Sequence, residues 1–152
     1  MEKKYLSKKE IRKMKSKERE IFEKMFSHYA KKEMEQFFSF FDPNVNWTVY
    51  GENFFAGNYK NIQLLEDAYQ RLYEMTTQVK QHVRWIIVEG NAAAAFLYDE
   101  IIGKDNKHYT IDYWLRLQLS PQTQKVIQVD NFMDCLQMQK IIKSTHFGRR
   151  VA

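Results

Sequence analysis

Two aspartates stand in stretches of sequence that alternate between apolar and polar side chains. Asp112 lies within Tyr109–Leu119, "YTIDYWLRLQL", where every odd position is apolar or aromatic. Such alternation predicts a β-strand with one apolar and one polar face, because successive side chains point to opposite sides. Asp99 lies in the preceding alternating stretch, "AAAAFLYDEIIG". If the turn between the two stretches pairs Ile102 with Tyr109, Asp99 lies directly opposite Asp112 on one face of a hairpin.

Two carboxyl groups in this arrangement have a specific chemistry. Their Cβ atoms are about 5 Å apart, so the charged forms repel each other. In an apolar pocket one carboxyl group stays protonated, and the pair supplies an acid and a base for proton transfer at a carbonyl or enol. If Leu115 and its odd-numbered neighbours face inward instead, Asp112 and Arg116 lie in solvent and have no such role. Both arrangements remain open, and the candidate catalytic residues are Asp112 and Asp99.

Other chemistries find little support in the sequence. Cys135 is the one cysteine, so it forms no intrachain disulfide, and its context "FMDCLQM" fits a buried structural thiol. The four histidines are far apart and lack the spacing of zinc ligands. There is no glycine-rich phosphate loop either. The sequence therefore predicts a protein without metal or cofactor, in a reducing, cytoplasmic setting.

The charge is concentrated at the N-terminus. Residues 1–20 contain nine lysines and arginines and four glutamates, which together account for the formal net charge of +5. We interpret this segment as a basic helical arm that begins with the capping box "SKKE" at residues 7–10. Tyr5 is the one aromatic side chain among its lysines, too few to form a stacking surface for bases, which argues against nucleic acid as a partner. No apolar run approaches the ~20 residues that span a bilayer, and no secretory signal is present, so no membrane partner is expected.

The rest of the chain predicts a single α+β domain. Helical spacing of apolar residues appears in "REIFEKMFSHYAKK", "KEMEQFFSFF" and "NIQLLEDAYQRLYEM". A strand is predicted in "VNWTVYG", followed by the loop "ENFFAGNYKN", and four short strands with tight turns follow between residues 79 and 133. This order favours a curved antiparallel sheet with helices on one face.

The order of these segments resembles the NTF2-like superfamily, in particular its SnoaL-like and ketosteroid-isomerase branch. The resemblance covers about residues 20–143 and is carried by "FFSFFDPNVNWTVYGENFFAGNYKNIQLLEDAY" and "KVIQVDNFMD". It implies a cone-shaped α+β fold, in which N-terminal helices pack on a curved antiparallel sheet and enclose an apolar pocket. The domains predicted on this basis are the arm 1–20, the NTF2-like domain 21–143 and a tail 144–152.

The resemblance carries over only part of the family's functional residues. Ketosteroid isomerases have a carboxylate base on the first strand, where this chain has Thr48, and a tyrosine on the first helix, where it has Lys24 or Met25. Their second acid follows an isoleucine, a context that Ile111-Asp112 matches. Relatives similar to limonene-epoxide hydrolase use an aspartate on the last strand, where this chain has Asn131. Steroid isomerisation and epoxide hydrolysis are therefore not implied.

These observations predict a ligand site and two classes of function. The predicted ligand-binding residues are Trp47, Tyr50, Leu97, Trp114 and Asn131. The first function is binding of a small hydrophobic carbonyl-type molecule, with isomerase, cyclase or lyase chemistry that needs no cofactor. The alternative is an NTF2-like domain that binds a ligand or a protein partner without catalysis. A homodimer is expected through the outer sheet face, where the leucines of Tyr109–Leu119 are candidates for the contact.

Overall fold

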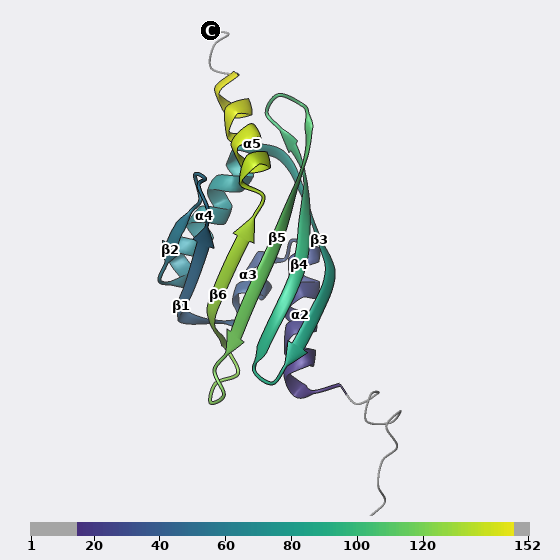
Figure 1. Ribbon diagram of the computed structural model, residues 1–152, viewed down its shortest axis with the longest axis vertical. Coiled ribbons are helices and arrows are strands. Elements are labelled where there is room, and N and C mark those ends of the chain that lie inside the picture. The colour runs from purple at the N-terminus through teal and green to yellow at the C-terminus, as the bar shows by residue number, and fades with distance from the viewer. Residues whose placement is uncertain (1–14, 148–152) are drawn as a thin grey trace, which may run out of the picture.

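The computed structural model describes residues 15–147 (Figure 1). Residues 1–14, which include the predicted capping box and most of the predicted arm, and residues 148–152 lie outside the described part. The elements in chain order are α2 (Lys17–Ala30), α3 (Met34–Phe38), β1 (Phe41–Tyr50), β2 (Gly57–Tyr59), α4 (Ile62–Glu74), β3 (Thr76–Glu89), β4 (Ala92–Gly103), β5 (His108–Leu119), β6 (Val126–Met133) and α5 (Cys135–Phe147).

The three predicted helices form, and each of the two longer ones begins at a residue suited to capping. Ser16 accepts a hydrogen bond from the Arg19 amide at the start of α2, and Asn61 accepts one from the Leu64 amide at the start of α4. Both side chains satisfy amides that the first helical turn leaves unpaired. The apolar stripes of the two helices are buried, namely Phe22, Met25, Phe26 and Tyr29 on α2, and Leu65, Ala68 and Leu72 on α4.

The six strands of residues 15–147 form one sheet in the order β2-β1-β6-β5-β4-β3. The predicted antiparallel run from β3 to β6 is confirmed. The expectation of a wholly antiparallel sheet is wrong at one place, because β1 and β6 pair in parallel. The antiparallel run from β3 to β6 brings β6 next to β1, and the two strands run in the same direction. The alternation of apolar and polar residues within β1 and within β6 does not indicate that these distant segments pair. Strand β2 forms within the segment predicted as a loop and pairs with β1.

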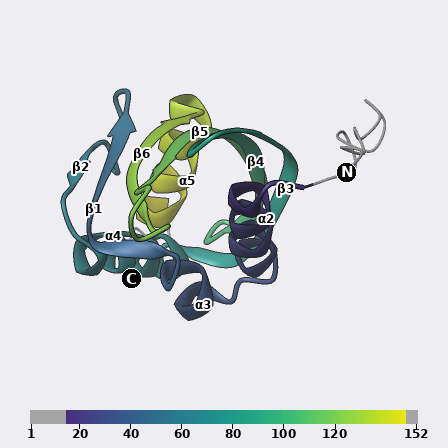
Figure 2. The same cartoon turned by 90° about the horizontal axis from the view of Figure 1, so that it is seen from below.

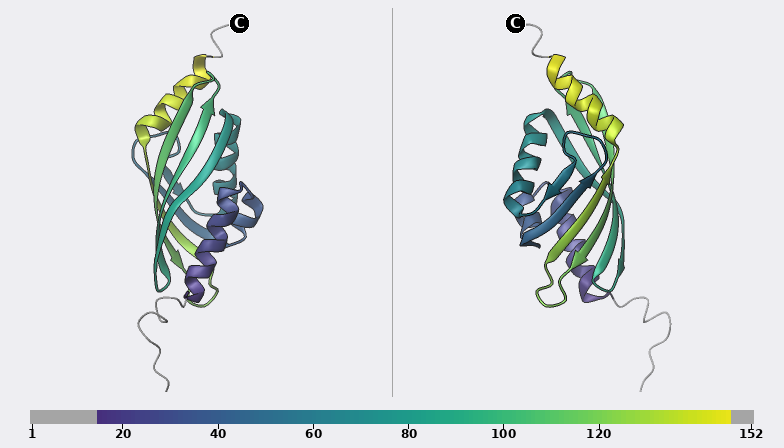
Figure 3. Two further views of the ribbon diagram at one scale, coloured as in Figure 1. Left: turned by 90° about the vertical axis from the view of Figure 1, so that its right-hand side faces the viewer. Right: turned by 60° about the vertical axis from the view of Figure 1, so that its left-hand side comes forward.

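Helix α5 was not among the predicted helices. The Asp134 carboxylate accepts a hydrogen bond from the Gln137 amide at 3.1 Å and so satisfies the first turn. The helix continues beyond residue 143, where the domain was predicted to end, and Ser144 within it is buried. Figure 3 shows α5 at the end of the sheet away from the start of α2.

The sheet curves around the helices, so one of its faces is concave (Figure 2). Odd-numbered residues of β4 and β5 point into this concave side, where the core lies. Leu115, Leu117 and Leu119 are among these buried residues, so the prediction that they form an outer dimer surface is wrong. The predicted α+β cone of helices on a curved sheet is confirmed. None of the helices described is both long enough and apolar enough to cross a membrane.

Candidate functional site

The two candidate aspartates lie on opposite faces of the sheet. Asp99 is opposite Ile111, and Asp112 is opposite Tyr98, so the register differs by one residue from the predicted one. The turn after β4 is shorter than expected because Asn106 adopts a positive φ of 60°, a conformation that asparagine tolerates. A slip of one residue moves a side chain to the other face. Asp112 is therefore exposed on the outer face, and its predicted place in the pocket is wrong.

Asp99 is the buried carboxyl group of the concave side. Its exposed fraction is 1%, and its Oδ1 accepts a hydrogen bond from the Tyr29 hydroxyl of α2 at 3.0 Å. Burial raises the pKa of Asp99 to about 7, because removal from water penalises the charged form. The hydrogen bond from Tyr29, the nearby Tyr113 hydroxyl and the positive charge of Lys32 lower this pKa, but they do not outweigh burial. Near neutral pH both the acid and the carboxylate are populated.

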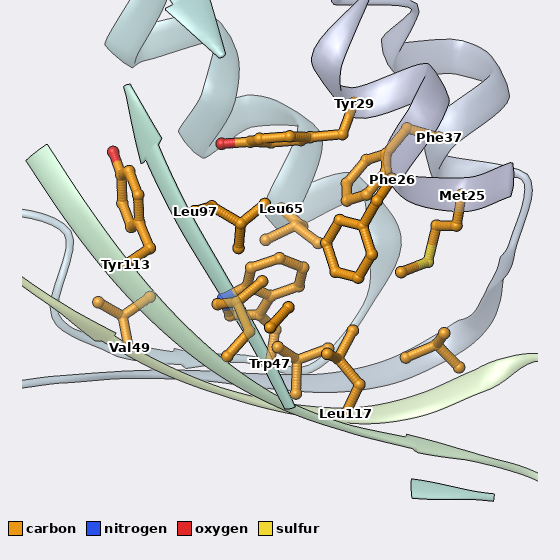
Figure 4. Packing of buried hydrophobic residues seen from close by; sticks show 14 of the residues in the cluster. Met25, Phe26, Tyr29, Phe37, Trp47, Val49, Leu65, Leu97, Tyr113 and Leu117 are labelled. Carbon is orange, nitrogen blue, oxygen red and sulfur yellow. The ribbon is translucent and has the colours of Figure 1, made fainter. Parts of the chain in front are cut away.

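Four tyrosines surround this carboxyl group. We use the name Asp99 cluster for Asp99 together with Tyr29, Tyr69, Tyr73, Tyr113 and Gln81. Figure 4 shows Tyr29 from α2 and Tyr113 from β5 with their hydroxyl groups directed towards the same region beside Leu97. Burial, with the nearby Asp99 charge as a smaller cause, raises the pKa of each of the four hydroxyls. The tyrosines therefore remain neutral and act as hydrogen-bond donors.

The cluster leaves one strong acceptor unsatisfied. Asp99 Oδ2 is buried, and among the described residues no donor forms a hydrogen bond with it. The Tyr113 hydroxyl nevertheless lies near enough to lower the pKa of the carboxyl group. Gln81 on β3 closes the cluster by accepting a hydrogen bond from the Tyr73 hydroxyl at 3.3 Å. Buried polar atoms are normally satisfied, so an orphan oxygen in a tyrosine cluster is a place for a further donor.

An apolar pocket lies next to the cluster, and its lining residues are Trp47, Val49, Phe55, Tyr59, Leu65, Ala68, Tyr69, Leu72, Tyr113, Asn131, Met133 and Met138. Tyr69 and Tyr113 belong both to this pocket and to the Asp99 cluster. The volume open to water is about 40 Å³, enough for about three water molecules. Asn131 Oδ1 is buried in the lining and accepts no hydrogen bond from the described residues. The pocket therefore suits a compact apolar molecule with one or two polar atoms.

The structure divides the predicted ligand-binding residues into three groups. Trp47 and Asn131 line the pocket. Leu97 is buried in the core and is not part of the lining. Tyr50 and Trp114 are 44% and 48% exposed on the outer sheet face, so their predicted place in the pocket is wrong. Both carry even numbers in strands whose odd-numbered residues face inward.

Tyr50 and Trp114 belong instead to an aromatic row on the outer face. The register places Trp85, Phe96, Trp114, Phe132 and Tyr50 side by side on five neighbouring strands. The Phe96 and Trp114 rings stack at 4.6 Å, and the Tyr50 and Phe132 rings stack at 4.7 Å. We call these five residues the outer aromatic row. It is a continuous apolar band across the face turned away from the helices.

Sequence reasoning missed the tyrosines of the Asp99 cluster. Tyr29 and Tyr69 stand in the apolar stripes of predicted helices, and Tyr113 stands among the apolar odd positions of Tyr109–Leu119. In each case the aromatic ring fits the stripe and the hydroxyl gives no separate signal. No three His, Cys, Asp or Glu side chains converge as a metal-binding group within residues 15–147.

The sequence itself matches no family model and no curated protein. Solved structures are similar over most of their length. An NTF2-like protein from Burkholderia thailandensis E264 superposes with a TM-score of 0.74 at 13% identity, covering 85% of this chain and 98% of that one. TerC co-crystallised with polyporic acid gives 0.72 at 14% identity, with 84% and 99% covered. A putative SnoaL-like polyketide cyclase from Shewanella denitrificans OS-217 gives 0.66 at 12% identity, with 86% and 99% covered.

These likenesses extend over the whole arrangement of helices and sheet. The identities are low, so the likeness concerns the arrangement of the chain in space and not its chemistry. The fold that the sequence resemblance implied is confirmed: the chain has the NTF2-like fold, in the form also seen in SnoaL-like proteins.

Proposed function

We propose that the pocket binds a small hydrophobic carbonyl-type molecule, whose oxygen accepts a hydrogen bond from Tyr113 with Asp99 behind it. The single observation that carries this proposal is the buried Asp99 carboxyl group, with a pKa raised to about 7, beside an apolar pocket. A buried titratable group of this kind is common at functional sites and rare elsewhere. TerC, which has a similar fold, was co-crystallised with polyporic acid, and this supports a small organic ligand.

The proposed chemistry is assistance of enol formation without a cofactor. A neutral tyrosine hydroxyl donates its proton to the carbonyl oxygen of the ligand, the protonated Asp99 reprotonates that hydroxyl, and the proton that leaves the α-carbon passes to a water molecule. Asn131 on the neighbouring strand also lines the pocket, and its buried side-chain oxygen can accept a hydrogen bond from a second polar atom of the ligand. Keto–enol isomerisation and aldol-type cyclisation or cleavage of carbonyl compounds pass through such an enol.

The second candidate is ligand binding without catalysis. One observation favours it: the described lining of the pocket contains no aspartate, glutamate or histidine that could take a proton from carbon. Thr48, at the position where the resemblance places the isomerase base, is on the outer face opposite Asp130. Both proposed functions involve the same ligand. They differ only in whether the protein promotes loss of a proton from a carbon atom of that ligand.

We also propose that a second copy of this chain covers the outer aromatic row. The row presents large aromatic side chains to solvent, with Trp114 48% and Phe132 49% exposed. A two-fold axis on the sheet face would pack the row on itself, as a symmetric interface requires. Arg116 next to the row pairs with Asp130, and Glu100 contacts His82, within the chain. Arg84 and Asp112 form no ion pair among the described residues, so these two opposite charges can pair between two copies.

A ligand titration followed by NMR tests the binding proposal. The probe is 2-cyclohexen-1-one, and methylcyclohexane is the control that lacks an oxygen. The proposal predicts saturable shifts of the Trp47 indole N–H and the Asn131 side-chain amide with the ketone and weaker binding of the hydrocarbon. Equal binding of both compounds, or none, would overturn it. Exchange of the ketone's α-hydrogens in D2O then separates the two candidates, because only the catalytic one accelerates exchange.

A further inference from the structure

A second and larger hollow in the described part of the chain shares no lining residue with the apolar pocket. It is a groove of about 830 Å³ between α2 and β3, lined by Glu23, Phe26, Ser27, Ala30, Lys31, Lys32, Val79, Lys80, Gln81, His82, Val83, Arg84, Ile86 and Tyr98. Strand β3 is the last strand of the sheet, so its outer edge has no neighbouring strand in the described chain. The groove follows that edge.

The lining shows that the groove opens onto the main chain of β3. Every residue from Val79 to Arg84 contributes to it. Side chains of a strand alternate between two faces, so a hollow on one face contacts only every second residue. A hollow that contacts all of them lies along the edge itself. The edge of a strand presents unpaired N–H and C=O groups, which are a template for a further strand.

The available edge has a definite length. The register between β3 and β4 is regular from Gln78 to Val83 and shifts at both ends of this run, between Thr76 and Gln78 and between Val83 and Trp85. A shift of this kind bends the strand and ends regular pairing. The run has room for about six residues of an added strand.

The two walls of the groove differ in character. On the inner side of the edge, Val79 and Val83 face Phe26 and Ala30 of α2, which makes an apolar floor. Four cations surround the groove, namely Lys31, Lys32, Lys80 and Arg84. The one lining glutamate, Glu23, already pairs with Lys15 and Arg19.

These cations have no carboxylate partner among the described residues. Lys32 lies over the Tyr73 ring at 4.4 Å, and Arg84 lies over the Tyr98 ring at 4.3 Å. Glu100, which is opposite Lys80 on β4, contacts His82 at 2.6 Å. The groove therefore combines an apolar floor with an excess of positive charge, and a complementary ligand alternates apolar and acidic side chains.

We propose that the free edge of β3 binds an extended acidic peptide of a partner protein as an added β-strand. Main-chain hydrogen bonds to Gln78–Val83 supply the affinity, and alternate side chains supply the specificity. Apolar side chains of the peptide pack against Phe26 and the valines, and acidic ones face Lys80 and Arg84. The basic segment 1–20 of this chain carries the wrong charge for the same groove.

Fluorescence anisotropy with a labelled eight-residue peptide of alternating valine and glutamate tests the proposal. The expected result is saturable binding that weakens with added salt. A peptide in which lysine replaces glutamate should bind at least ten times more weakly. Equal binding of the two peptides, or no binding of the acidic one at millimolar concentration, would overturn the proposal.

Backbone methylation tests the added strand directly. In a strand, the amides of alternate residues point to the same side, so only one set can bond to β3. Two peptides are compared, one with all valine amides methylated and one with all glutamate amides methylated. One of the two should not bind, and the other should bind like the parent peptide. If both methylated peptides bind like the parent peptide, the added strand is ruled out.

Charge reversal locates the site on the protein. The double substitution Lys31→Glu and Lys80→Glu should weaken binding of the acidic peptide at least tenfold. The matched control is Lys140→Glu with Lys143→Glu, which makes the same change in net charge at exposed positions of α5 outside the groove. An equal effect of both pairs would show attraction by overall charge only and would contradict a site on β3.

Discussion

Tyr29 and Asp99 are seventy residues apart in the chain, and the Tyr29 hydroxyl donates a 3.0 Å hydrogen bond to the Asp99 carboxyl group inside the cone. Tyr29 lies about one helical turn after Met25, where the sequence resemblance aligned the family's tyrosine. The bond joins helix α2 to strand β4. It fixes one oxygen of a carboxyl group whose other oxygen accepts no bond from the described residues.

The raised pKa of Asp99 predicts how stability depends on pH. An unfolded aspartate titrates near 3.8 and the folded Asp99 near 7, so between these values the folded protein holds the extra proton. The contribution of Asp99 to stability is complete below about pH 4 and is lost as the pH rises through 7. Asp99→Asn removes this titration. The free energy of unfolding of the variant relative to the wild type should rise by about 3 kcal/mol from pH 5 to pH 8.

Chemical denaturation of both proteins at pH 5 and pH 8 measures this difference. A relative stability that is the same at both pH values would mean that the folded-state pKa of Asp99 is not raised above its unfolded value.

Asp112→Asn is expected to have almost no effect. Asp112 is exposed on the outer face, opposite Tyr98, and most substitutions at such positions change stability by less than about 0.5 kcal/mol. Ligand affinity and proton exchange should also remain at wild-type values. A large loss of either in this variant would return Asp112 to the site and contradict the register of the β4–β5 hairpin.

The contrast between these two aspartates shows how far the sequence carries the structure. Alternation predicts β4 and β5 and the face to which each residue belongs within its own strand. It leaves the pairing between strands undetermined, because that depends on the turn, here on the positive φ of Asn106. One residue of register decides whether Asp99 and Asp112 share a face of the sheet or lie on opposite faces.

The pocket was predictable in outline and not in detail. The element order predicts a cone, and Trp47 and Asn131 line its pocket, while their contact with a ligand stays a prediction. The tyrosine cluster comes from α2, α4 and β5, and no local pattern brings these segments together. Nor does any local pattern indicate that β1 runs parallel to β6.

Tyr29→Phe is predicted to raise the pKa of Asp99 further. The hydroxyl donates to the carboxyl group and favours its charged form, so its removal leaves burial less opposed. The carboxyl ¹³C shift of Asp99 followed against pH measures the change. Tyr109→Phe is the matched control, because its hydroxyl bonds Asp105 and not Asp99. A fall in the pKa of Asp99 in the Tyr29 variant would contradict this account of the cluster.

If the outer aromatic row is the contact of a homodimer, charged side chains introduced into the row should weaken the dimer. Trp85→Glu combined with Trp114→Glu places one carboxylate at the β3 end of the row and one at its centre, and the centroids of these two rings are 5.1 Å apart in a T-shaped contact. The dissociation constant measured by sedimentation equilibrium should rise at least tenfold. Leu136→Glu is the control, at a position of α5 that is 61% exposed and outside the row. A wild-type protein that sediments as a monomer at micromolar concentration would rule out the dimer.

The central claim is that Asp99 is the titrating group behind the ligand pocket, and the pKa of Asp99 with and without 2-cyclohexen-1-one tests it most directly. In the free protein the carboxyl ¹³C signal should titrate near 7. The Tyr113 hydroxyl lowers the pKa of Asp99. Because the ketone draws that hydroxyl towards itself, saturation with ketone should raise the pKa of Asp99. An Asp99 that titrates near 3.8, or whose pKa is unchanged by saturating ketone, would contradict the proposed site.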